Sequence, residues 1–471
     1  MSGQQCPRLL WYSYRKELPE ITLFDKHKFA QGREFEVYVK KLFPEGVDLK
    51  DLSNEENIKE TKKLIEQKKT IFEAGIIYKD LFLKADILEP VNDGWCLYEI
   101  KASTQVKPEH IPDLAFQKYV CEKAGLNIKK CFVIFLNKEY VKKGDINSKE
   151  LVSKDDVTEK VDSTTNIDKD TALYLKVIKE TNPPNISISK NCNKPHECPL
   201  KEECWKTLPE HNVLQLTNWR VYWKLFEEGI LNIKDIPKGV NLKDKDLAIK
   251  EAVDNNKIFV SKEKIRAFLK SLNYPLYHLD FETFDTAVPM FDKSSPYQKM
   301  PFQFSSHIQA KDSKIKHFEF LAEGENDPRP TLLKALKSQI GKNGDVIVFN
   351  KSFEINVLKK LAENFPEHKP WLDNVLGRIV DLAFPFQNFY YYDPKQNGKY
   401  SIKKVLPSIT GKGYSELEIN NGGDASMQFF YSHIKHELDD IDGIRENLLK
   451  YCCLDTEGMV WIVEELKKLT K

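Results

Sequence analysis

Two carboxylates inside an apolar strand constrain this chain more than any other feature. The segment PLYHLDFETF, residues 275–284, places Asp280 and Glu282 in an aromatic and aliphatic run that is typical of a buried strand. Side chains alternate along a strand, so both acids point to the same face. Like charges there are costly unless a cation lies between them, and hard divalent cations prefer oxygen ligands. The segment predicts a metal-binding strand, although for the segment taken alone a water-facing Asp-x-Glu is the commoner explanation.

Two later segments strengthen the metal-site interpretation. Residues 345–362 predict a short buried strand, a turn and a helix, with Glu354 at the junction. Residues 447–469 predict an amphipathic helix in which Tyr451 and Asp455 share one face, because they are four residues apart. Both lie among Leu, Cys, Met, Val and Ile, where a lone carboxylate is expensive. The acids of three segments are therefore expected to converge.

The C-terminal part resembles the ribonuclease H-like exonucleases of the DEDD class, the DnaQ-like group that holds DNA polymerase proofreading domains and ribonuclease D. That family carries Asp-x-Glu on its first strand, a second acid at an Asn-x-x-Phe segment, and a third acid after Tyr-x-x-x on a late helix. The resemblance implies that Asp280, Glu282, Glu354, Asp455 and Tyr451 are catalytic residues. The four acids among them would also be the metal ligands.

One position departs from the family pattern. Glu354 stands where the family usually has Asp, and Asp381 in GRIVDLAFP is the alternative fourth ligand. The resemblance implies two Mg²⁺ or Mn²⁺ ions, about 3.5–4 Å apart, that clamp the scissile phosphate. Tyr451 would orient the water or the phosphate. The implied activity is 3′-to-5′ exonuclease cleavage to nucleoside 5′-monophosphates.

A second set of charged residues lies in the N-terminal half. Residues 81–104 contain two apolar strands around an Asp-Gly turn signal and predict a β-hairpin. Asp86 lies on the first strand, and Glu99 and Lys101 share one face of the second. Such a set suits phosphodiester cleavage, because the acids hold a cation and lysine steadies the phosphate or the water. A cross-strand ion pair at a sheet edge explains the three residues about equally well.

The hairpin resembles the PD-(D/E)XK restriction-endonuclease-like fold of RecB-type nucleases, whose motif is Asp-x(n)-Glu-x-Lys. Gln117 resembles the glutamine of that family's next motif, but Tyr119 follows it by two residues instead of four. An early helix of the family often carries a metal-binding His, and here Glu36 occupies the matching position. The resemblance implies four catalytic residues, namely Asp86, Glu99, Lys101 and Gln117. It implies three metal ligands, namely Asp86, Glu99 and Glu36.

Three cysteines lie close together in NCNKPHECPLKEECW. Cys192, Cys198 and Cys204 are separated by five residues each, and Cys6 lies near the start of the chain. In a reduced protein such spacing more often marks a metal site than chance. Zinc bound by the four thiolates, or by the clustered three and His196, is one interpretation. The pattern also resembles the iron–sulfur nucleases, namely CRISPR-adaptation RecB-like exonucleases and AddB-type helicase–nucleases, which implies a [4Fe-4S] cluster and is preferred.

The length of 471 residues predicts two or three domains. We expect a RecB-like domain at 1–207, a charged helical linker at 208–272 and a ribonuclease H-like domain at 273–471, all of α/β class. Residues 154–170 are polar and charged and predict a loop or a poorly ordered insert. A formal net charge of +1 gives no overall argument for a nucleic-acid partner, but local basic clefts remain compatible with it.

The two halves together resemble an uncharacterised bacterial family that fuses a RecB-like nuclease to a ribonuclease H-like domain. We expect a metal-dependent nuclease of repair, turnover or defence, acting on DNA rather than RNA, with a helicase or a repair or defence protein as partner. The opening residues lack an apolar signal core and no stretch reaches a membrane span, so a cytoplasmic location is expected. The alternative is a nucleic-acid-binding protein with degenerate sites, for which FYYYDP at 389–394 offers a base-stacking platform.

Overall fold

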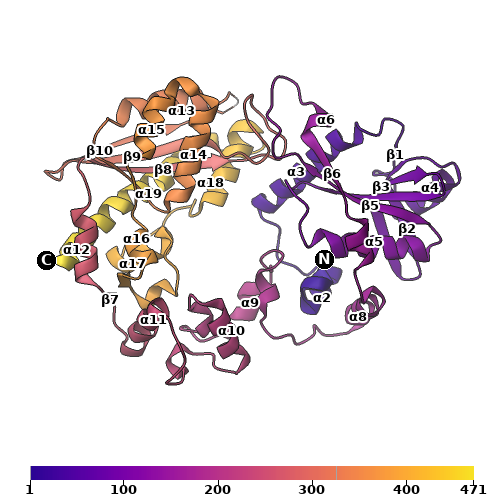
Figure 1. Ribbon diagram of the computed structural model, residues 1–471, viewed down its shortest axis with the longest axis horizontal. Coiled ribbons are helices and arrows are strands. Elements are labelled where there is room, and N and C mark those ends of the chain that lie inside the picture. Colours follow the sequence, from indigo (N-terminus) through magenta and orange to yellow (C-terminus); the bar gives the residue numbers. More distant parts are fainter. Residues whose placement is uncertain (1, 325) are drawn as a thin grey trace. The chain divides into compact units, whose positions relative to one another are not determined.

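The computed structural model describes residues 2–324 and 326–471 and divides into two compact units (Figure 1). The first unit contains the chain up to Lys206 together with Thr286–Gln298, and the second contains Thr207–Asp285 and Lys299–Lys471. Each unit has its own sheet covered by helices, which confirms the α/β class.

The first unit is built on a six-stranded mixed sheet with the order β1-β2-β3-β4-β5-β6. Its strands are β1 (Val47–Asp48), β2 (Ile71–Tyr78), β3 (Leu81–Val91), β4 (Gly94–Lys101), β5 (Ile128–Leu136) and β6 (Val152–Asp156). The pairs β1–β2 and β4–β5 are parallel, and the other pairs are antiparallel. The antiparallel pairing of β3 with β4 confirms the predicted hairpin.

Helices cover both faces of this sheet. The helices of the unit are α1 (Ser2–Gln5), α2 (Pro7–Arg15), α3 (Leu23–Lys40), α4 (Asn54–Glu66), α5 (His110–Lys123), α6 (Ser148–Leu151), α7 (Thr158–Asp162), α8 (Ile167–Lys179) and α9 (Lys201–Trp205). Phe35 and Val39 of α3 belong to the apolar core on one face, whereas Leu64 of α4 and Leu114 of α5 belong to the core on the other. A sheet buried on both faces explains the apolar strands of this half.

The prediction of a loop at residues 154–170 was wrong. Residues 152–156 form the edge strand β6, and two helices, α7 and the start of α8, follow. Val157 and Val161 are buried against the sheet. Two valines among many charges gave too weak an apolar pattern to indicate these elements.

The second unit is built on a five-stranded mixed sheet with the order β10-β9-β8-β11-β12. Its strands are β8 (Leu276–Phe284), β9 (Met300–Gln309), β10 (Ile315–Leu321), β11 (Asp345–Val348) and β12 (Ile379–Asp381). Strand β8 lies at the centre, antiparallel to β9 and parallel to β11. The strand with Asp280 and Glu282 is therefore flanked on both sides, as its apolar sequence requires.

The faces of β8 differ in chemistry. Helices α13 (Arg329–Gln339), α14 (Lys351–Asn364) and α15 (Lys369–Leu376) cover one face of the sheet (Figure 1). Tyr277, Leu279 and Phe281 pack into an apolar core with these helices. The opposite side chains, including Asp280 and Glu282, face the long C-terminal helix α19 (Ile441–Thr470), which packs on β8 and β9. The remaining helices of the unit are α10 (Trp219–Glu227), α11 (Asp244–Asn255), α12 (Lys262–Lys270), α16 (Phe384–Gln387), α17 (Ile402–Thr410) and α18 (Gly422–Phe429).

Residues 208–272 are mainly helical, but they also contain β7 (Phe259–Val260), which pairs with β13 (Tyr391–Tyr392). Tyr391 and Tyr392 are buried with this pair. These two side chains are therefore closed to stacking on bases, and the platform predicted at 389–394 was wrong for them.

The connection between β8 and β9 runs through the first unit. Within that unit, Gln31 accepts a hydrogen bond from the Ala287 amide, and the Tyr297 hydroxyl donates to the Ala102 carbonyl over 2.6 Å.

None of the described helices combines the length and the apolar run that crossing a lipid bilayer requires.

Candidate metal and catalytic sites

Three carboxylates converge between β8 and α19 in the second unit. Asp280, Glu282 and Asp455 each offer an oxygen, and these oxygens lie within 4.8 Å of one another. Glu282 and Asp455 are buried and Asp280 is nearly so. The predicted convergence of the strand acids with the acid of the late helix is therefore present in the structure.

The electrostatics of this group are those of crowded like charges. Burial, Asp455 and Glu282 together raise the pKa of Asp280 well above its usual range. Burial and Asp455 raise the pKa of Glu282 to about 8, and burial raises that of Asp455 to about 6. A divalent cation bound among the three oxygens would remove this penalty, because it favours their charged forms.

Two tyrosines and a lysine partly compensate the acids. The Tyr414 hydroxyl donates a hydrogen bond to Asp455, and Tyr451 lies beside it, with the two ring centroids 6.0 Å apart. Lys403, on α17, places its ammonium group 5.1 Å from the centre of the Tyr451 ring. The hydroxyls and the ammonium lower the pKa of Asp455, against the larger effect of burial.

Glu354 and Asp381 have different surroundings. Glu354, in the first turn of α14, is buried, and its Oε2 has no hydrogen-bond partner among the described residues. Burial raises its pKa to about 8, and Asp381 and Asp455 add to the shift. Asp381 accepts hydrogen bonds from the amides of Asn350, Lys351 and Ala383 over 2.9 to 3.2 Å, so it holds the turn that begins α14.

The charged residues of the β3–β4 hairpin also come together. The register of β3 and β4 places Asp86 beside Glu99, and the Ile100 amide donates to Asp86 over 2.6 Å. The Lys101 ammonium lies 2.5 Å from Glu99, and the Gln117 amide donates to Glu99 over 2.6 Å. Four of the five residues predicted for this half thus form one contact network.

The pKa values in the network are strongly shifted. Burial and Glu99 raise the pKa of Asp86 well above its usual range. Burial also raises the pKa of Glu99, although Lys101 opposes it. Burial alone would lower the pKa of Lys101, but Glu99 and Asp113 raise it, so the lysine stays charged.

Glu36, the fifth residue, is placed differently. Its carboxylate pairs with Lys40 over 2.5 Å, and Lys40 also pairs with Asp48. Glu36 acts electrostatically on Glu73 of β2, and Glu73 in turn acts on Asp86. Glu73 therefore couples Glu36 electrostatically to the hairpin acids.

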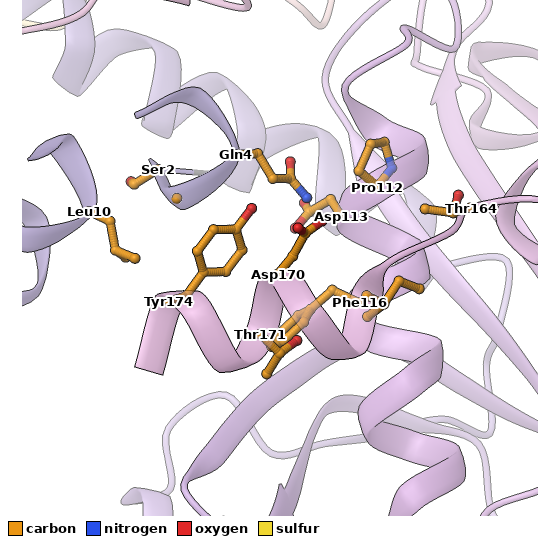
Figure 2. Close-up of a pocket in the computed structure, with 12 residues that line it drawn as sticks. Ser2, Gln4, Leu10, Pro112, Asp113, Phe116, Thr164, Asp170, Thr171 and Tyr174 are labelled. Atoms are coloured by element: carbon orange, nitrogen blue, oxygen red, sulfur yellow. The ribbon is translucent and has the colours of Figure 1, made fainter. Parts of the chain in front are cut away.

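A cavity of about 650 Å³ adjoins this network in the first unit (Figure 2). Asp113, which pairs with Lys101 over 3.3 Å, lines it, and Gln4, Asp170 and Tyr174 lie around the same space. Asp113 is thus the residue through which the network borders the cavity.

The four cysteines of the predicted cluster surround a small cavity of about 130 Å³ in the first unit. The sulfur atoms of Cys6, Cys192 and Cys204 all act electrostatically on Cys198, which is buried. His196 is exposed and does not line the cavity. The structure brings together the distant Cys6 and the clustered three, and none of the nine cysteines forms a disulfide.

Sequence reasoning missed four residues of these sites. Asp113 and Lys403 lie on helices whose charge pattern is that of a solvated surface, and Tyr414 lies in a loop, so no local spacing singles them out. Glu73 carried a usable signal, because IFEAGIIY is an apolar strand with one carboxylate, as in the segment around Asp280.

Comparison with known proteins gives relatives without a described activity. Residues 277–401 match a family model described as a domain of unknown function, DUF2779. The chain is 26% identical over 243 residues to the uncharacterized protein MG366 of Mycoplasma genitalium, covering 47% of this chain and 36% of that protein. It is 27% identical over 245 residues to the uncharacterized protein UU173 of Ureaplasma parvum, covering 46% and 34%.

The chain thus spans about a third of the length of these relatives. The range matched by the family model contains Asp280, Glu282, Glu354 and Asp381 but ends before Asp455. No solved structure matches the chain.

Proposed function

We propose that the second unit is a ribonuclease H-like, metal-dependent 3′-to-5′ exonuclease that hydrolyses phosphodiester bonds of nucleic acid, DNA rather than RNA. The observation that carries the proposal is the group of Asp280, Glu282 and Asp455, whose oxygens lie within 4.8 Å of one another in a buried site. A buried group of three carboxylates with raised pKa values fits hard divalent cations such as Mg²⁺ or Mn²⁺.

The side chains of the site would have different roles in hydrolysis. Bound ions would activate water and neutralise the charge that develops on the phosphate. Asp280, Glu282 and Asp455 would hold those ions. The orphan oxygen of Glu354 makes it a better fourth ligand than Asp381, whose oxygens already accept three backbone hydrogen bonds.

Tyr414, Tyr451 and Lys403 line the same group. Tyr414 orients Asp455 through its hydrogen bond. Tyr451 would orient the attacking water or the phosphate by its hydroxyl, and Lys403 would attract the phosphate, because its charge lies beside the acids.

For the first unit we propose a RecB-like PD-(D/E)XK nuclease site. Asp86 and Glu99 would hold the cation and Lys101 the phosphate, while Gln117 orients Glu99. The second candidate function, nucleic-acid binding without cleavage, is favoured for this unit by the pairing of Lys101 with both Glu99 and Asp113, which occupies its ammonium group.

We further propose that Cys6, Cys192, Cys198 and Cys204 hold a [4Fe-4S] cluster in preference to zinc. Zinc–sulfur bonds of about 2.3 Å place tetrahedral sulfurs less than about 4 Å apart. Among the described residues, no three of these cysteines form a group with sulfurs within 4.8 Å of one another. A cluster of four irons spaces its thiolates more widely than one ion does.

The test of the nuclease proposal uses the whole chain with 5′-labelled single- and double-stranded DNA and RNA in Mg²⁺ or Mn²⁺. We expect stepwise shortening from the 3′ end, and a loss of rate of about a hundredfold or more in Asp280→Asn and in Asp455→Asn, because metal clamping supplies several kcal/mol. Asp373→Asn, an exposed acid on α15, is the matched control and should keep full activity. Full cleavage by both site variants would exclude this site.

A further inference from the structure

A second group of metal-ligating side chains in the second unit belongs to neither proposed nuclease site. His307 of β9, His317 of β10 and Cys453 of α19 each offer one ligand atom, and these atoms lie within 4.8 Å of one another. The antiparallel register of β9 and β10 places the two histidines opposite each other. Their rings stack with centroids 4.3 Å apart and planes 20° from parallel.

Hydroxyl groups fix both imidazole rings. His307 Nδ1 lies 2.8 Å from the Thr456 hydroxyl, and His317 Nε2 lies 3.0 Å from the Ser305 hydroxyl. The two hydroxyls are themselves 2.7 Å apart and hydrogen bonded. Histidines that bind metals commonly hold one ring nitrogen by such a hydrogen bond, which orients the ring and leaves the second nitrogen for the ion.

An acidic side chain lies at the same place. The Glu319 carboxylate is 3.8 Å from His317 Nε2, and it also acts electrostatically on Cys453. His307 is buried, whereas His317 is about 30% exposed and Cys453 is partly exposed, so an ion can enter from solvent. Two imidazoles and a thiolate provide three ligands, and the Glu319 carboxylate adds a negative charge beside them.

We propose that His307, His317 and Cys453 bind one zinc-class divalent ion, with the Glu319 carboxylate beside the site to balance its charge. Imidazole and thiolate ligands select Zn²⁺ over Mg²⁺, so this site differs in metal preference from the carboxylate group. The inference stands independently of the proposed nuclease activity.

The position of Cys453 gives the ion a structural consequence. Cys453 lies on α19 between Tyr451 and Asp455, and the histidines lie on the two strands at that side of the sheet. An ion bound by all three would join α19 to β9 and β10. It would thereby hold the helix segment from which Asp455 projects.

The experiment measures how fast the Cys453 thiol is alkylated, separately from the other cysteines. The whole chain is stripped with a chelator under reducing conditions and incubated with Zn²⁺ alone. It is then treated with iodoacetamide, and alkylation of each cysteine is read from its peptide by mass spectrometry. We expect Zn²⁺ to slow alkylation of Cys453 by about tenfold or more, because the bound thiolate is withdrawn from reaction.

Two variants make the result specific. His317→Asn removes a partly exposed ligand and should abolish the protection of Cys453, whereas His368→Gln, a histidine elsewhere in the same unit, should keep it. Circular dichroism establishes that both variants are folded. Equal alkylation of wild type with and without Zn²⁺, or equal protection in His317→Asn, would overturn the proposal.

Co²⁺ titration gives a second readout. Wild type should show a thiolate-to-cobalt absorption component that Cys453→Ser lacks, while the signal from the four-cysteine site is common to both proteins. Identical cobalt spectra for the two proteins would also overturn the proposal.

Discussion

At the scale of single residues, burial has more influence than charge on the carboxylates of the second unit. Glu282 and Glu354 lie in apolar surroundings, and burial is the largest cause of their raised pKa values. Lys403 is close enough to lower the pKa of Glu282, but its own pKa is lowered by burial, so its compensation is partial. The site is therefore destabilised when it is empty and fully ionised.

This destabilisation predicts a pH dependence of folding. The pKa values of Glu282 and Glu354 rise from 4.5 in the ordinary residue to about 8 in the folded protein. Between these values the folded state binds more protons than the unfolded state, so the free energy of unfolding falls as pH rises. In the presence of a chelator, the contribution of these two groups to the free energy of unfolding should be largest below pH 4.5. It should be lost by about pH 8.

Urea unfolding at a series of pH values, with and without Mn²⁺, measures this effect. Glu282→Gln should flatten the fall in the chelator, because the substituted side chain no longer titrates. Mn²⁺ should restore most of the stability lost at high pH by binding the ionised carboxylates. A slope that is the same in wild type and Glu282→Gln would contradict the assignment.

Glu354 and Asp381 can be separated by their different roles. We expect Glu354→Gln to lower exonuclease activity by about a hundredfold without lowering thermal stability, since one proposed ligand is lost and a buried charge is removed. Asp381→Asn should lower the melting temperature, because it weakens the hydrogen bonds at the start of α14, and should retain more activity. Loss of activity in Asp381→Asn alone, with its stability unchanged, would reverse the assignment.

At the scale of elements, the sequence was sufficient where the pattern was local. The alternation of PLYHLDFETF predicted β8, the Asp-Gly turn predicted the β3–β4 hairpin, and the apolar face of 447–469 predicted most of α19. The excursion Thr286–Gln298 and the pairing of β7 with β13 depend on contacts between distant segments, which local periodicity does not record.

The sites follow the same rule. Asp280 and Glu282 were identifiable because both acids lie in one apolar strand, and Asp455 because it lies on the apolar face of a helix. Lys403 and Tyr414 reach the same group from α17 and the loop after it, and the spacing of their neighbours in sequence does not indicate an acidic site. Only the tertiary structure brings them to the acids.

The four cysteines join distant elements of the first unit, which gives a prediction at this scale. Cys6 precedes α2, and Cys204 lies on α9. Cys198→Ser should lose iron from anaerobically prepared protein and lower the melting temperature of the first unit, since ligand binding is coupled to folding. Cys96→Ala, which removes a thiol from the sheet core, should keep the iron. Stoichiometric zinc without iron in wild type would exclude the [4Fe-4S] cluster.

At the scale of the whole molecule, the two proposed nuclease sites lie in separate compact units. Asp86, Glu99 and Lys101 belong to the first unit, and Asp280 and Asp455 to the second. No residue is shared between the two sets, so substitutions in one set are expected to leave the other set's contacts intact.

This separation predicts two activities that can be removed one at a time. Lys101→Ala should lower cleavage by the first unit by about tenfold or more, because its ammonium group steadies the phosphate or the water. It should leave the 3′-end shortening by the second unit unchanged, and Asp280→Asn should do the reverse. The measurement is the product pattern of wild type, both single variants and the double variant on labelled DNA with free and with blocked 3′ ends. If the first unit only binds nucleic acid, Lys101→Ala will change affinity and leave every product unchanged, while Asp280→Asn alone will abolish cleavage. If both units cut, the double variant will lose both products, and the rate of each product will fall by the same factor as in the single variant that affects it. The two sets of residues act on different substrate bonds, so their effects on the activation free energies are independent.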